Sequence, residues 1–316
     1  MNNRIVISSD HVDSHGDVMT KLALESGAEI INGERKVRMG VQHKKDLPPL
    51  GKIINARVEE SDGHYYLVAE QFEYDTYEDV SWNKDLVKAS SSVDNHPFNE
   101  PDFDVPEKLE ITVDRQNFKN YSDFESYLTF VESIHSEVQT GEFGRKAQIN
   151  DPEIVLKLTE YFLVYKLLKP ALEKTAKKIS EKVSDKLTVE SEKLYDFIRK
   201  SLKEFLLRVI PKNRPVSYVI KLAGKPEIEL FAKITDPEML IRALKQNKLE
   251  KLRDEIQAIN VNVDFEKIQF ILTEKGKWKF NFLLTEKGET IGRKVSFKKR
   301  DKMLELVTKK TKARKK

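Results

Sequence analysis

Alternating apolar and polar positions in the first 140 residues predict a domain made mostly of strands. Five segments have the two-residue period, or the enrichment in β-branched and aromatic residues, that is typical of strands. They are Arg4–Ser9, Lys52–Glu60, His64–Glu73, Leu86–Val93 and Leu109–Asp114. The Ser61-Asp62-Gly63 segment between the second and third of these predicts a hairpin turn. A capping pattern at Ser122 predicts one helix, whose apolar positions share a face from Phe124 to Val138.

The spacing of apolar positions changes to that of helices after residue 150. Asp151-Pro152-Glu153 is typical of a helix start, because it supplies a capping side chain, a proline for the first turn and a nearby carboxylate. Helical spacing then continues almost to Ile210, with a break expected at Pro170. Farther on, strand patterns flank a helix that begins at Asp236-Pro237-Glu238. The chain is therefore expected to belong to the α+β class.

These patterns divide the chain into five consecutive regions. They are a β-rich domain (1–140), a linker (141–150), a helical hairpin (151–210), a small α+β domain (211–300) and a basic tail (301–316), whose last eight residues, KKTKARKK, are expected to be disordered.

No membrane span and no signal peptide are expected. The apolar stretch Ile154–Leu172 contains four charged residues, each of which costs about 2.5–3.5 kcal/mol at the centre of a bilayer. They are Lys157, Glu160, Lys166 and Lys169. The first ten residues lack a basic region followed by an apolar one.

Charge separates the chain into an acidic and a basic part. Residues 1–150 hold 16 Lys and Arg against 28 Asp and Glu, whereas residues 151–316 hold 40 against 24. The basic part would suit an acidic scaffold protein, the acidic part of another copy, or the phosphates of a nucleic acid. Cys is absent, which excludes disulfides, thiolate zinc sites and a cysteine nucleophile.

A group of His and Asp residues near the N-terminus raises the question of a metal site. His11, Asp13, His15 and Asp17 follow one another at a spacing of two, which on a strand would place them on one side. The segment also contains Gly and Ser, so a hydrogen-bonded loop is favoured over a metal site. A phosphate loop, a dinucleotide fingerprint and a helical zinc motif are missing from the sequence, and we expect no cofactor.

The order of the short motifs is more specific than any of them alone. Asp13, Gly16 and Asp17 fit a D-x-x-G-D-like segment, and His43 precedes Pro49-Leu50-Gly51-Lys52. The three serines 90–92 follow 47 to 49 residues after His43. In this order, residues 4–115 resemble the prohead (capsid maturation) proteases of tailed phages, whose fold is related to that of the herpesvirus assemblins.

The resemblance implies a serine nucleophile with a histidine base. Ser92-Val93 fits the Ser–aliphatic–Gly pattern of the family best, which makes Ser92 the nucleophile and His43 the base that takes its proton. Asp94 stands where the family has Gly. Ser90 shares a strand face with Ser92 and is the second choice, whereas Ser91 would point to the other side.

The third catalytic residue stays open between Glu110 and His64. Glu110 would act from a later strand of the domain. His64 would be the third catalytic residue if the site followed the Ser-His-His arrangement of the assemblins.

The resemblance further implies a serine endopeptidase that processes capsid or scaffold proteins, including itself, during phage head assembly. Such a protein would form homo-oligomers and act in the host cytoplasm or the virion. Two alternatives stay open. One is a non-catalytic structural or interaction protein of the same fold, which the Asp at position 94 favours. The other is a cellular effector protease with a regulatory C-terminal domain.

Overall fold

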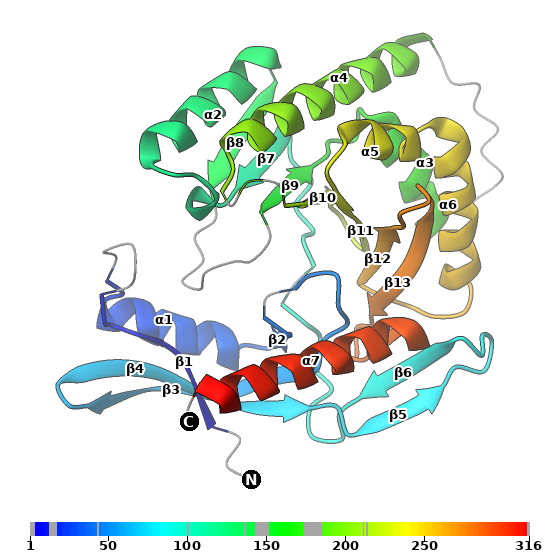
Figure 1. Ribbon diagram of the computed structural model, residues 1–316. Coiled ribbons are helices and arrows are strands. Elements are labelled where there is room, and N and C mark those ends of the chain that lie inside the picture. Colours follow the sequence, from blue (N-terminus) through cyan, green and yellow to red (C-terminus); the bar gives the residue numbers. More distant parts are fainter. Residues whose placement is uncertain are drawn as a thin grey trace. The chain divides into compact units, whose positions relative to one another are not determined.

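The protein is described from a computed structural model (Figure 1). The structure describes residues 4–12, 18–42, 44–99, 101–135, 137–142, 152–173, 185–210, 212 and 214–314. Helix and strand are both extensive, which confirms a mixed α and β chain. The chain divides into two compact units, one of Met1–Pro101 with Asn281–Lys316 and one of Asp102–Phe280. These units differ from the regions expected from composition, because regions 1–140 and 211–300 are each split between them.

The first unit contains a four-stranded antiparallel sheet in the order β1-β4-β3-β2. Its strands are β1 (Arg4–Ser9), β2 (Val37–Met39), β3 (Gly51–Ser61) and β4 (His64–Glu73). Asp62 and Gly63 both have positive φ angles, 53° and 76°, as a two-residue hairpin turn requires. The hairpin expected at this position is therefore confirmed.

Helix α1 (Lys21–Asn32) packs on this sheet. Thr20 caps the helix, since its hydroxyl accepts a hydrogen bond from the Ala23 N–H at 3.2 Å. One face of the helix then buries apolar side chains against β3 and β4. The buried residues of this cluster are Leu24, Ala28, Ile31, Ala56, Leu67 and Ala69.

A second antiparallel group of strands in the first unit joins segments from both ends of the chain. Strands β5 (Thr76–Asp79) and β6 (Leu86–Ser90) come from the N-terminal segment, and β14 (Thr290–Arg293) pairs with β6 and with residues 282–284 of β13 (Trp278–Leu284). Their core combines residues far apart in sequence. It consists of Tyr74, Ala89, Phe98, Phe282, Leu284 and Phe297.

The C-terminal basic region is helix α7 (Lys294–Arg314), not a disordered tail (Figure 1). Met303, Leu304 and Val307 form an apolar stripe at helical spacing, and they pack on a cluster that includes Leu47 and Leu50. Partial burial of this stripe gives the helix a tertiary partner despite its many charges. The helix continues to Arg314, so the disorder expected from residue 309 was wrong as far as residue 314.

The second unit is a mixed sheet of six complete strands and residues 278–280 of β13, the neighbour of β12, with helices packed on it. The strand order is β12-β11-β10-β9-β7-β8, in which β7–β8, β9–β10 and β11–β12 are parallel pairs. The strands are β7 (Leu109–Val113), β8 (Val138–Glu142), β9 (Glu153–Lys157), β10 (Val216–Leu222), β11 (Glu227–Ile234) and β12 (Lys267–Leu272). The helices are α2 (Tyr121–Ile134), α3 (Leu163–Leu168), α4 (Asp185–Arg208), α5 (Pro237–Ala243) and α6 (Gln246–Asn260). Two 3₁₀ turns, Arg115–Asn117 and Lys169–Leu172, complete the unit.

The helical hairpin expected over 151–210 is only partly present. Glu153–Lys157 is a strand, because Ile154 and Leu156 bury one face while Glu153 and Lys157 on the other face carry charge. Helix α4 confirms the second half of the expectation. The apolar face predicted for it, from Leu194 to Val209, is buried. Residues 174–184, most of the expected linker (143–150) and Asp151 of the expected helix start lie outside the described residues.

Candidate functional site

Ser92 lies in a loop just beyond strand β6. The strand was expected to continue to Val93, but it ends at Ser90, where the backbone has paired with Thr76. The alternation argument that separated Ser91 from Ser92 therefore does not apply to this loop. Ser92 is exposed, while the Ser91 hydroxyl accepts a hydrogen bond from the Val93 N–H at 3.2 Å.

The partner of Ser92 is the carboxylate of Asp75. The Ser92 hydroxyl donates a short hydrogen bond to Asp75 Oδ2, and its backbone N–H lies 3.1 and 3.2 Å from the two carboxylate oxygens. The hydroxyl hydrogen bond is the main cause that lowers the pKa of Asp75 below its ordinary value. Asp75 is therefore ionised at neutral pH, and its carboxylate stabilises the loop by accepting hydrogen bonds from Ser92.

A buried ion pair fixes the rest of this loop. Lys52 is only 1% exposed, and its Nζ lies 2.6 Å from Asp94 Oδ1. The same Nζ donates to the backbone oxygens of Asp94 and His96 at 2.8 and 2.7 Å. Burial lowers the pKa of Lys52, and Asp94 opposes this shift. Three acceptors around one ammonium satisfy all of its donors.

Asp94 has a second role in the loop. Burial raises the pKa of Asp94, but its bonds to Lys52 and to His96 outweigh burial and lower it. Asp94 Oδ1 accepts the His96 N–H at 3.0 Å, and Oδ2 lies 3.1 Å from His96 Nδ1. The residue that departs from the family pattern thus serves as the counter-ion of Lys52.

The turn at Gly288 closes over this ion pair. Gly288 has a φ of 64°, and a Cβ there would collide with the His96 carbonyl and with Lys52 Nζ. Only glycine therefore allows the C-terminal segment to approach the loop so closely.

The other predicted catalytic residues are either outside the described residues or have partners other than Ser92. His43 lies outside the described residues. Glu110 is on β7 in the second unit, where Lys157 Nζ is 3.2 Å from it and 2.9 Å from Asp102. His64 begins β4 and has Asp10 as its partner. Within the described part of the chain, Ser92 is thus joined to Asp75 and to neither Glu110 nor His64.

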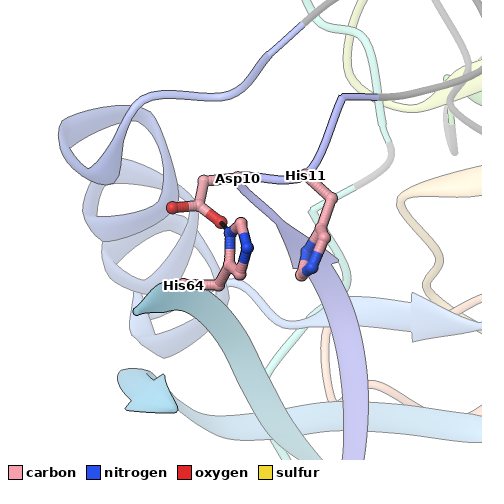
Figure 2. A group of neighbouring side chains, drawn as sticks. All are labelled: Asp10, His11 and His64. Atoms are coloured by element: carbon pink, nitrogen blue, oxygen red, sulfur yellow. Dashed lines mark hydrogen bonds and ion pairs between the residues drawn. The ribbon is translucent and has the colours of Figure 1, made fainter. Parts of the chain in front are cut away.

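A second group of polar side chains lies where β1 ends and β4 begins (Figure 2). His64 Nδ1 is 3.0 Å from Asp10 Oδ1, and the rings of His64 and His11 stack with centroids 3.9 Å apart. One possible metal-ligand atom from each of these three residues lies within 4.8 Å of the other two. The sequence pattern had grouped His11 with Asp13, His15 and Asp17, which lie outside the described residues. His64 was missed as a neighbour because only strand pairing brings it to His11.

Sequence reasoning also missed a buried ionic network on the sheet of the second unit. Lys267 Nζ lies 2.8 Å from Glu229 Oε2 and 3.2 Å from Glu227 Oε1. Gln269 Nε2 donates to the other oxygen of Glu229 at 2.5 Å. The cross-strand pairs Glu227–Lys267 and Glu229–Gln269 place these side chains on one face. Lys221 Nζ, 3.7 Å from Glu227 Oε2, supplies the second positive charge, so the two carboxylates are compensated, which fits a structural role.

No family model, no curated protein and no solved structure matches the chain. In the described part of the chain, none of the helices combines the length and the apolar character that a membrane span requires.

Proposed function

We propose that the chain is a serine endopeptidase of the prohead-protease type, with Ser92 as the nucleophile and His43 as the general base. The observation that supports it is the buried Lys52–Asp94 ion pair. This pair joins Lys52, the last residue of the Pro49-Leu50-Gly51-Lys52 motif, to the loop of Ser92-Val93-Asp94, although they are some 40 residues apart in sequence. The loop is thereby fixed at its base while Ser92 stays exposed to substrate. An assemblin-related fold over residues 4–115 is part of the same proposal.

The reaction would follow the usual course of acyl transfer. Ser92 Oγ bonds to the carbonyl carbon of a peptide while its proton passes to a ring nitrogen of His43. The C–N bond then breaks, and the leaving amine takes the proton from His43. Water, deprotonated by the same histidine, hydrolyses the acyl-enzyme ester and restores the serine.

Asp75 cannot replace the histidine in this scheme. Its pKa is lowered, so it is a weak base at neutral pH. Its hydrogen bond holds the Ser92 hydroxyl in one orientation and has to be given up when the proton moves to His43. Glu110 pairs with Lys157 and His64 with Asp10, so the scheme uses neither as a third catalytic residue.

The resemblance supplies the substrate class for this proposal. Capsid or scaffold proteins would be cleaved, including other copies of the chain, in the host cytoplasm or the virion. The basic residues of the C-terminal half would hold the enzyme to an acidic scaffold or to packaged nucleic acid.

A second candidate function is supported by the same loop. The hydroxyl of Ser92 is occupied by Asp75, and Asp94 replaces the glycine of the family pattern. Both features would suit a virion structural or interaction protein that keeps the fold without catalysis.

Labelling with a fluorophosphonate separates the two candidates. We expect the wild-type chain to be labelled at Ser92, as located by peptide mass spectrometry, and Ser92→Ala and His43→Ala to lose the label. Ser91→Ala is the matched control, because its hydroxyl has a different partner, and it should keep the label. An unlabelled wild-type chain that also leaves a co-expressed scaffold protein intact would favour the non-catalytic function. Labelling that persists in Ser92→Ala would move the assignment to Ser90.

A further inference from the structure

The geometry points to a binding site for a divalent transition-metal ion formed by Asp10, His11 and His64, which we propose to be independent of the function assigned to Ser92. These residues combine two imidazoles with one carboxylate, a ligand set that suits zinc and its neighbours in the first transition row. Three protein ligands leave the fourth position of a tetrahedral ion open to water.

Strand pairing fixes the three side chains relative to one another. The Asp10 N–H donates to the Tyr65 carbonyl at 3.1 Å, which continues the β1–β4 ladder one residue beyond β1. The next antiparallel step places His11 opposite His64, and their rings stack at 3.9 Å with an angle of 22° between planes. Figure 2 shows the Asp10 carboxylate at one edge of the His64 ring and the His11 ring alongside it.

The distances already approach those of a metal site. With zinc–nitrogen distances of about 2.0–2.1 Å, two ligands of a tetrahedral ion are about 3.3 Å apart. Asp10 Oδ1 and His64 Nδ1 are 3.0 Å apart, so an ion would take the place of the hydrogen between them. Neutral His64 would then carry its proton on the other ring nitrogen. The His11 ligand atom lies within 4.8 Å of the other two, and the exposed His11 ring would have to turn to bring it onto the ion. If Nδ1 is the ligand atom, its contact with Ser9 Oγ at 3.2 Å is given up when the ion binds.

A bound ion would fasten an edge of the sheet. In the order β1-β4-β3-β2, strand β1 has β4 as its single neighbour among the described strands. An ion held by Asp10 and His11 after β1 and by His64 at the start of β4 would link the two strands beyond their last ladder bond.

Zinc binding by the full, untagged chain tests the proposal. After removal of metal with a chelator, we expect titration with Zn²⁺ against a chromogenic competitor to show one ion bound per chain. His11→Ala, His64→Ala and Asp10→Asn should each weaken binding at least tenfold. His96→Gln is the matched control, an exposed histidine that also pairs with an aspartate, and it should bind like wild type. Ser92→Ala should also bind like wild type, which separates this proposal from the proposed protease activity.

Amide hydrogen exchange gives an independent readout. Zinc should slow exchange in Arg4–Ser9 of the wild-type chain and leave it unchanged in His64→Ala. The proposal is overturned if the wild-type chain binds no zinc at micromolar concentration. It is equally overturned if the three ligand variants bind zinc as tightly as wild type.

Discussion

Lys52 shows how a single charged residue is held in the interior of this protein by a complete set of partners. The ammonium has Asp94 and two backbone oxygens around it and almost no contact with solvent. Breaking a buried pair by removing one partner usually costs about 3–5 kcal/mol, because the other charge stays buried without compensation.

We therefore expect Lys52→Met to lower the free energy of unfolding by about 3–5 kcal/mol, measured by urea denaturation. The matched control is Lys84→Met, since Lys84 is exposed in the turn before β6 and its loss should change stability by no more than about 0.5 kcal/mol. Equal stability of the two variants would show that the ion pair does not hold the Ser92 loop.

Lys169 gives a second prediction, concerning pH. Burial lowers its pKa to about 8, while Glu227 and Glu160 act in the opposite sense. Between about pH 8 and its ordinary value of 10.5, the unfolded chain binds the proton that the folded chain has released. The free energy of unfolding should therefore rise with pH in this window for wild type relative to Lys169→Met. A constant difference between the two from pH 7.5 to 10 would contradict the lowered pKa.

Residue types could be recognised from the sequence, but their partners could not. Gly51-Lys52 and Ser92-Val93-Asp94 were both singled out, yet the Lys52–Asp94 pair depends on two segments meeting in the folded chain. His11 was placed with its sequence neighbours, although its ring stacks on His64 from the next strand of the sheet. The hydrogen bond from the Ser92 hydroxyl to Asp75 could not be predicted from the sequence either, because it too depends on how the two segments meet in the folded chain.

At the scale of elements, helix α7 shows how a run of charges can hide an apolar stripe. Lys and Arg dominate its sequence, but Phe297, Leu304 and Val307 reach two different apolar clusters of the first unit. Arg300 is also buried and donates to the Pro49 carbonyl at 2.6 Å. Strand β9 was expected to be helical for a different reason. A strand of five residues is too short to show its two-residue period next to helical segments.

The stripe on α7 can be tested with two leucines of the same helix. Leu304→Ala should lower the free energy of unfolding by about 1–3 kcal/mol, since the side chain packs on the cluster around Leu47 and Leu50. Leu306→Ala should change it by no more than about 0.5 kcal/mol, because Leu306 is 46% exposed. Thermal or urea unfolding measures both effects. A larger loss of stability from Leu306→Ala than from Leu304→Ala would contradict this assignment of the buried face of α7.

At the scale of the whole molecule, charge and contacts divide the chain differently. Composition changes near residue 150, whereas the first unit combines the acidic N-terminal segment with the basic C-terminal segment. Ion pairs such as Lys299–Asp46 and Lys294–Asp79 join these segments at 2.7 and 2.8 Å. Part of the opposite charge that suggested association between copies is therefore compensated within one chain.

The two units should differ in their ability to fold as fragments. Residues 102–280 form a continuous unit, and we expect this fragment to unfold cooperatively on its own in urea, followed by circular dichroism. Residues 1–101 alone should not, because their cores lack Phe282, Leu284 and Phe297. Joining 1–101 to 281–316 through a flexible linker should restore cooperative unfolding. A stable 1–101 fragment would contradict the division.

Because the first unit combines both ends of the chain, it can finish folding only near the end of translation. Strand β6 emerges early in translation, but its partner β14 and the helix that covers the Leu47 cluster are made last. At roughly 5–20 residues per second, synthesis of residues 102–280 takes about 10–35 s. During that interval the nascent N-terminal segment carries apolar side chains and an unpaired strand edge that only the end of translation can cover. Gly288, which lies against the Ser92 loop, belongs to the same late segment. The packing around this loop is therefore completed only when the chain is nearly finished.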